Sequence, residues 1–81
     1  PQGQLAHPDS VDGLAELARR ENEHPMVRHE ALEALGAVAT PKCQEILKEF
    51  VEHPERVISE SCKVALDIYE YENDPTAFQY A

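Results

Sequence analysis

The sequence has few basic side chains. Among its 81 residues, seven Lys and Arg stand against 16 Asp and Glu, which gives a net charge of −9. A protein that binds nucleic acid needs a basic surface against the phosphates, so this composition argues against a nucleic-acid-binding function. A solvated acidic face that aids solubility is the simplest explanation of the charge, and a basic protein partner is also compatible with it.

Cysteines and long apolar runs are scarce as well. The two cysteines, Cys43 and Cys62, are too few for a disulfide scaffold, so we expect two reduced and at least partly buried thiols. No apolar run approaches the roughly 20 residues that span a bilayer, which argues against a membrane protein. We therefore expect a soluble protein of the cytoplasm, with no membrane among its partners.

Motifs for phosphate binding and nucleophilic catalysis are also missing. Ser59 and Ser61 have no nearby base in the sequence that would activate a serine as a nucleophile, and Ser10 is instead suited to be a helix N-cap. A Gly-rich phosphate loop is excluded because the glycines are scattered, at Gly3, Gly13 and Gly36. We therefore assign no catalytic side chain from the sequence.

Helix signals dominate what the sequence does contain. The dipeptide His-Pro occurs three times and Thr-Pro once. Each is a helix start signal, because proline fits the first helical turn and disfavours helical geometry in the residue before it. Apolar residues recur three and four positions apart, and no segment alternates with period two. We predict an all-α fold with helices at about residues 9–20, 25–39, 41–52 and 54–71, and an irregular tail at 72–81.

The second and fourth predicted helices are related in sequence. At an offset of 31 residues, apolar or small side chains coincide at five positions, pairing Val27 with Ile58, Ala31 with Cys62, Ala34 with Ala65, Leu35 with Leu66 and Val38 with Tyr69. A helix-pair unit of about 30 residues is typical of an α-solenoid of antiparallel pairs, in which three or more units normally stack. Residues 1–81 hold about two units, so we expect the end of a longer array.

The first predicted helix lacks a stacking neighbour on one side of such a short array. Its apolar residues Val11, Leu14 and Leu17 should therefore be partly exposed. Apolar surface that stays exposed loses about 25 cal/mol of stabilisation per Å² compared with buried surface, and a domain has only about 5–15 kcal/mol of stability in total. We expect the isolated chain to self-associate or to have low stability.

An adjacent His-Glu pair, His29-Glu30, lies at the edge of the apolar stripe of residues 25–39. Successive helical residues are about 100° apart, which puts the predicted core stripe at Val27, Ala31, Ala34, Leu35 and Val38. The same geometry places four side chains together on one flank of that stripe, namely Met26, His29, Glu30 and Glu33. Arg28 and Leu32 fall on the opposite flank.

Imidazole and carboxylate together suit iron, zinc or manganese. Adjacent residues on a helix diverge, so one pair supplies at most two ligands. The positions equivalent to His29 and Glu30 in the fourth predicted helix are Glu60 and Ser61, so the pair is not repeated there. From the residues alone a solvated His29 and a surface carboxylate at Glu30 explain the pair more simply than a metal site does.

Three stretches of the chain resemble a known enzyme family. They are HPMVRHEALEALGAVA at 24–39, PERVISESCKVALDIYEYEN at 54–73 and FQYA at 78–81. Together they resemble the C-terminal end of the deoxyhypusine hydroxylases, which are HEAT-like repeat enzymes of the eukaryotic cytosol, and the resemblance extends over about residues 3–81. It implies a di-iron monooxygenase that hydroxylates deoxyhypusine on eukaryotic translation initiation factor 5A to form hypusine.

The family holds two Fe(2+) ions on four His-Glu pairs, and the resemblance assigns the last pair to His29 and Glu30. It also implies that Met26 and Glu30 lie at the substrate pocket. With one pair of four, the chain alone is expected to be inactive and not to hold iron. The alternatives are a non-catalytic HEAT-like scaffold that binds a protein partner and, ranked last, a related repeat domain with a lyase-like or phycobiliprotein-associated function.

Overall fold

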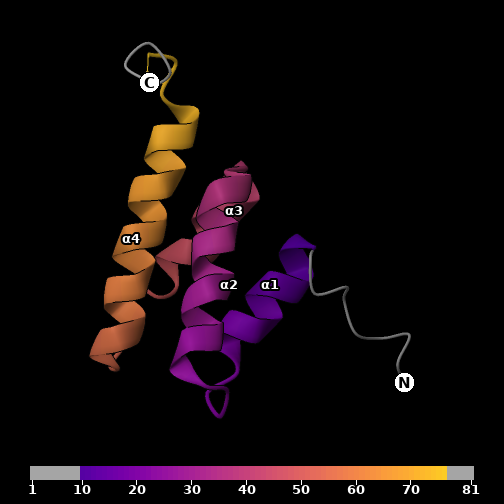
Figure 1. The fold of residues 1–81 in the computed structure, drawn as a ribbon, viewed down its shortest axis with the longest axis vertical. Helices are drawn as coiled ribbons and strands as arrows, with labels where there is room; N and C mark the ends of the chain where they lie inside the picture. Colours follow the sequence, from indigo (N-terminus) through magenta and orange to yellow (C-terminus); the bar gives the residue numbers. More distant parts are fainter. Residues whose placement is uncertain (1–9, 77–81) are drawn as a thin grey trace.

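Four helices make up the part of the chain, residues 10–76, that the computed structural model describes. They are α1 (Val11–Arg19), α2 (Pro25–Val38), α3 (Pro41–Lys48) and α4 (Arg56–Asn73), and no strand occurs among these residues. α2 and α4 lie side by side and run in the same direction, α1 packs against α2, and α3 contacts both α2 and α4 (Figure 1). The predicted all-α fold of helix pairs is confirmed.

The helix starts follow the predicted capping signals. The Ser10 hydroxyl accepts a hydrogen bond from the Gly13 N–H at 3.0 Å, and the Thr40 hydroxyl accepts one from the Cys43 N–H at 3.3 Å. His24 caps α2 with its imidazole, since Nδ1 accepts a hydrogen bond from the Met26 N–H at 3.0 Å. Each cap satisfies a backbone donor that has no partner within its own helix.

Several helix boundaries differ from the prediction. α4 begins at Arg56 rather than at residue 54, because the Glu55 N–H donates to Nδ1 of His53 and holds a turn before the helix. α3 ends at Lys48, and the residues after it form turns. α4 reaches Asn73, whose side-chain amide donates to the carbonyl of Tyr69 and so supports the last turn. The rest of the predicted tail lies partly outside the described residues, as does residue 9.

The core is formed where α2 is enclosed by the other three helices. Its buried apolar residues are Ala15, Ala18, Ala31, Leu32, Leu35, Cys43, Ile46, Leu47, Phe50, Ile58, Cys62 and Ala65. Val11, Leu14 and Leu17 are partly buried and pack against this core, so part of their surface is exposed, as predicted. In the described part of the chain, no helix combines the length and apolar character needed to cross a membrane.

The predicted core stripe of α2 is partly wrong. Ala31 and Leu35 are buried, but Val38 is 45% exposed, while Arg28 and Leu32 from the opposite flank are almost completely buried. The reason is that α2 has helices on more than one side, so its buried surface is wider than a single stripe. Arg28, for example, donates a hydrogen bond to the Ala18 carbonyl of α1. A helical wheel shows which residues share a face, but it does not show how many neighbours the helix has.

Candidate functional site

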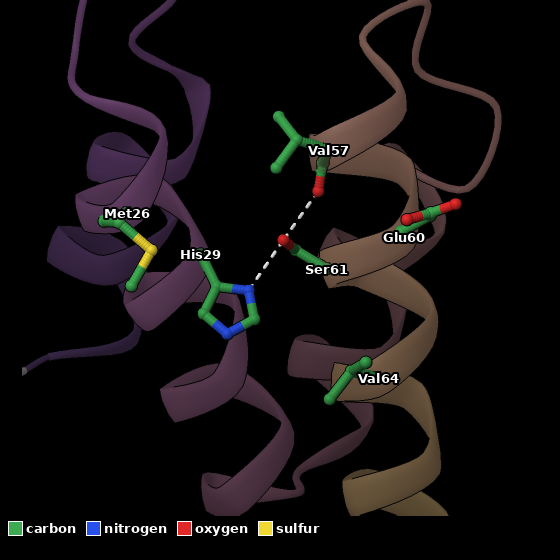
Figure 2. A pocket seen from close by; sticks show the side chains of 6 residues that line it. All are labelled: Met26, His29, Val57, Glu60, Ser61 and Val64. Carbon is green, nitrogen blue, oxygen red and sulfur yellow. Dashed lines mark hydrogen bonds between the residues drawn. The ribbon is translucent and has the colours of Figure 1, made fainter.

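A groove of about 340 Å³ lies between α2 and α4. Six side chains line it, three apolar and three polar: Met26, His29, Val57, Glu60, Ser61 and Val64 (Figure 2). The first two belong to α2 and the other four to α4, the two helices related by the sequence repeat. The groove is therefore built from equivalent turns of two successive repeat units.

His29 has a polar partner at each ring nitrogen. Nδ1 lies 2.6 Å from the Ser61 hydroxyl oxygen, and Nε2 lies 3.0 Å from a carboxylate oxygen of Glu33, one helical turn further along α2. The side chain is 27% exposed, so the ring is reachable from the groove while its orientation is set by its two neighbours.

Ser61 is buried, and its hydroxyl donates to the Val57 carbonyl at 2.6 Å (Figure 2). The sequence suggested no base near this serine, but the fold brings His29 within hydrogen-bond distance of it. The arrangement is still not that of an activated nucleophile, because the hydroxyl proton points to the carbonyl of the preceding turn instead of to the imidazole. No catalytic serine is therefore assigned among the described residues.

The groove walls are apolar, and its edge carries a negative charge. Met26, Val57 and Val64 all expose large parts of their side chains along it. The Glu60 carboxylate accepts a hydrogen bond from Nε of Arg56 at 2.8 Å, and this contact holds the pKa of Glu60 below its ordinary value. Glu60 is thus ionised near neutral pH, with a cation from its own helix already close by.

The structure separates the residues that the sequence placed together at this site. Met26 and His29 both line the groove, whereas Glu30 is exposed and is not among the lining residues. This divergence follows from the wide angle between adjacent side chains on a helix. The roles predicted for Met26, His29 and Glu30 remain predictions.

Sequence reasoning did not predict that Ser61 and Glu33 flank the His29 ring. Glu33 was placed on the same helix flank, which agrees with its contact to Nε2. The repeat offset pairs Glu30 with Ser61 and His29 with Glu60, so it already indicated that these positions are equivalent on neighbouring helices. It did not indicate that the Ser61 hydroxyl is directed toward the imidazole.

Residues 10–76 do not provide a complete set of metal ligands at the groove. No group of three or more His, Cys, Asp or Glu side chains in this range is arranged to hold a metal ion. The donor types at α2 nevertheless fit iron, because an imidazole nitrogen and carboxylate oxygens from one helix are common contributors to non-haem iron sites. A metal site that used His29 and a neighbouring carboxylate would therefore need further ligands from other segments.

The paired helices and the groove between equivalent turns define a helical-repeat protein. Residues 3–67 match the HEAT-repeat family, and the chain belongs to it. Over 79 residues, which are 98% of the chain, it is 57% identical to deoxyhypusine hydroxylase of Mus musculus and 54% identical to that of Homo sapiens. The resemblance noted in the sequence is confirmed.

A solved structure shows the same arrangement of helices. The human deoxyhypusine hydroxylase in complex with glycerol superimposes with a TM-score of 0.73 and 54% identity, over 86% of this chain and 24% of that chain. The chain spans about a quarter of the length of the curated relatives it matches, which is 26% in both the mouse and human proteins.

Proposed function

We propose that the chain is a segment of a deoxyhypusine hydroxylase and contributes one pair of iron ligands to that enzyme. The observation that carries this proposal is the 57% identity to the mouse enzyme across 98% of the chain, a stretch that includes His29 and the groove. The intact protein would hydroxylate deoxyhypusine on eukaryotic translation initiation factor 5A and so complete hypusine.

His29 and Glu30 are the proposed ligands, through an imidazole nitrogen and a carboxylate oxygen. Iron held there would supply the activation of dioxygen that hydroxylation of an aliphatic carbon needs. Ser61 lies against Nδ1 of His29, as a neighbouring polar group usually does at one nitrogen of a metal-binding histidine. Iron at Nε2 would take the place of the Glu33 carboxylate, which lies 3.0 Å from that nitrogen. Glu30 is exposed, so its carboxylate is free to turn toward a metal ion that is also held by ligands from other segments.

The groove suits an aliphatic side chain that ends in amines. Met26, Val57 and Val64 offer apolar walls to its methylene groups, and Glu60 adds a carboxylate at the edge. The net charge of −9 favours the approach of a basic side chain over an acidic one. Met26 and Glu30 are the residues we assign to substrate contact from α2.

A non-catalytic HEAT-like scaffold has less support, because both relatives compared above carry the name of a hydroxylase. We assign the protein to the cytoplasm, where its two unpaired cysteines, Cys43 and Cys62, would stay reduced. The isolated chain would be inactive, since His29 and Glu30 are one ligand pair of the four that the resemblance implies.

The test is a chimera in which this chain replaces the matching quarter of the mouse enzyme. Incubated with deoxyhypusine-bearing factor 5A, the chimera should add one oxygen to the side chain, as measured by mass spectrometry. His29→Ala or Glu30→Gln in the grafted segment should abolish the reaction and lower the iron content. His53→Asn is the matched control, because His53 lies away from the groove and its Nδ1 accepts a backbone hydrogen bond.

Two outcomes would contradict the proposal. One is a folded chimera that contains the iron of the parent enzyme but does not hydroxylate. The other is full activity after His29→Ala, which would show that another residue completes the ligand set. For the isolated 81-residue chain, stoichiometric and tightly held iron would contradict the expectation that its single pair cannot retain the metal.

A further inference from the structure

α4 carries an exposed row of side chains that runs from the groove toward the end of the helix. Five residues form it, at alternate spacings of three and four positions, and they are named the α4 stripe: Val57, Glu60, Val64, Asp67 and Tyr71. These spacings keep the five side chains on one face of a helix. All five are exposed, and the apolar members are 43–57% exposed. At 1.5 Å per helical residue the stripe is about 21 Å long.

The first part of the stripe belongs to the groove, and the rest extends beyond it. Val57, Glu60 and Val64 line the groove, whereas Asp67 and Tyr71 lie about one and two helical turns further along α4. Figure 2 shows Val57 and Val64 on the side of the helix that faces α2, with Glu60 on its outer side. α4 lies at one edge of the described part of the molecule (Figure 1), and none of the other described helices covers the stripe. A ligand that fills the groove can therefore continue along α4.

The chemistry of the stripe selects a basic partner. Apolar and carboxylate side chains alternate along it, so a purely apolar partner would bury carboxylates without a counter-charge, which is costly. Lys and Arg side chains satisfy both kinds of residue, because their methylene stems cover apolar surface while the charged head group reaches a carboxylate. The ring of Tyr71, which is 57% exposed, can also take a cation on its face.

The negative charge becomes stronger as the stripe leaves the groove. Residues 64–76 contain four acidic side chains and no Lys or Arg, and the C-terminal end of α4 adds the negative end of the helix dipole. Nearer the groove, the Glu60 carboxylate already holds a cation, since Nε of Arg56 donates to it at 2.8 Å. Asp67 forms no ion pair with another described residue. A second copy of the chain would bring the same carboxylates and a net charge of −9 against the stripe, which opposes self-docking there.

We infer that the α4 stripe docks a basic stretch of the protein substrate, next to the side chain that enters the groove. The inference rests on the proposed function, which provides a protein substrate whose reacting side chain ends in amines. About six residues of extended chain, at about 3.3 Å each, span the stripe. Val57 and Val64 contact the part nearest the reacting side chain. Asp67 and Tyr71 bind the part that lies beyond the groove, so they recognise the protein substrate and not its modified side chain alone.

The first experiment is a titration of the ¹⁵N-labelled 81-residue chain with deoxyhypusine-bearing factor 5A, followed by the backbone amide shifts. We expect the largest changes along the α4 stripe, with Asp67 and Tyr71 included, and little change on α3. Changes confined to the groove residues, or no change at all, would overturn the inference. So would stripe shifts that depend on the concentration of the chain without factor 5A, because a second copy would then be the occupant.

Kinetics of the chimera with the mouse enzyme test the two residues beyond the groove. Asp67→Lys should raise the KM for deoxyhypusine-bearing factor 5A about tenfold with kcat nearly unchanged, because repulsion replaces attraction in binding and not in the chemical step. Glu45→Lys is the matched control: it changes the net charge equally, but Glu45 is exposed on α3, outside the groove and the stripe. Tyr71→Ser should raise the KM about threefold, and Tyr71→Phe, which keeps the ring, should restore it.

Equal KM values for Asp67→Lys and Glu45→Lys would overturn the inference, since net charge alone would then explain the effect. An unchanged KM in the Tyr71→Ser chimera would overturn it as well. Both outcomes are measured on an active chimera, so they are distinct from failure of the proposed function. An inactive chimera, together with amide shifts along the stripe in the 81-residue chain, would reject the hydroxylase assignment and leave the docking surface intact.

Discussion

Gly36 lies where α2 comes closest to α4. A Cβ atom at this position would overlap the Ala65 backbone carbonyl, with 3.0 Å to the carbonyl carbon and 3.2 Å to Cα. Backbone atoms in the middle of a helix cannot turn aside as a flexible side chain can. The missing side chain therefore sets how near the two helices that form the groove approach each other.

Gly36→Ala should therefore destabilise the chain, although alanine is the better helix former by about 1 kcal/mol. Overpacking against α4 is expected to reduce the free energy of unfolding by about 1–3 kcal/mol. Ala37→Gly, at the neighbouring exposed position, is the control. It should lower the free energy of unfolding by up to about 1 kcal/mol through helix propensity alone. Urea unfolding measures both; a Gly36→Ala variant more stable than the parent would contradict the close helix contact.

Cys62 is a buried thiol whose sulfur donates to the Leu47 carbonyl at 2.8 Å. Burial raises the pKa of Cys62, because the thiolate would lose its hydration in the core. In the unfolded chain the thiol ionises near its ordinary pKa of about 8.5. Above that pH the unfolded state therefore binds fewer protons than the folded state.

The free energy of unfolding should consequently fall as the pH rises above about 8.5, by at most about 1.4 kcal/mol per pH unit from this group. The decrease ends once the pH passes the raised pKa of the folded state. Urea titrations between about pH 7 and 10 measure it, and Cys62→Ala should show a flatter dependence in the same range. Equal slopes in the two proteins would mean that Cys62 does not carry the effect.

At the scale of elements, Arg28 connects three helices through a buried guanidinium. Its Nε donates to the Ala18 carbonyl at the end of α1 at 2.9 Å, and its Nη1 pairs with Glu55, the N-cap residue of α4, at 3.0 Å. Nη2 has no hydrogen-bond partner among the described residues. Since a buried charge is costly without a counter-ion, Glu55 is important for keeping Arg28 inside.

Glu55→Gln should therefore lower the free energy of unfolding by about 1–3 kcal/mol, because it removes the charge that balances a buried guanidinium. Glu49→Gln is the matched control: Glu49 also pairs with an arginine, Arg19, but both side chains are about half exposed. That exposed pair is worth less than about 1 kcal/mol. If the two variants lost the same stability, the burial of Arg28 would not be what makes Glu55 important.

At the scale of the whole molecule, α1 covers one side of α2 and leaves part of its own apolar surface open. Val11, Leu14 and Leu17 pack against the core but are only partly buried. Relatives of this chain are about four times longer and so contain further segments, whereas in a solution of the isolated chain a second copy can cover this surface. Its net charge of −9 acts against such contacts by repulsion between copies.

We therefore expect the isolated chain to self-associate, and more strongly at high salt, since salt screens the repulsion and leaves apolar burial in place. Sedimentation velocity at low and high ionic strength, with increasing protein concentration, measures this. The expectation is contradicted if the chain stays monomeric at both ionic strengths and unfolds in a two-state transition above about 65 °C, beyond the usual mesophile range.

The helices and the family relationship were predictable because both depend on residues that are close in sequence. Ser10, Thr40 and the residues before the prolines act on their own next turn, and the repeat at an offset of 31 residues is visible without a structure. Helix ends were less predictable, since the start of α4 depends on His53 and its end depends on Asn73. Met26 and His29, which the sequence places on one flank of α2, both line the groove, whereas Ser61 was not predicted as their neighbour.

By itself, the sequence determined that this protein is all-helical, that it repeats a helix pair, and that an imidazole and carboxylates share one flank of α2. The tertiary structure alone decided that Arg28 is buried, that Gly36 meets Ala65, and that Ser61 holds the ring of His29. The physical reason is the same in each case. Helical periodicity fixes directions around one axis, whereas these contacts depend on the rotation and spacing of two helices, which the packing of many side chains sets together.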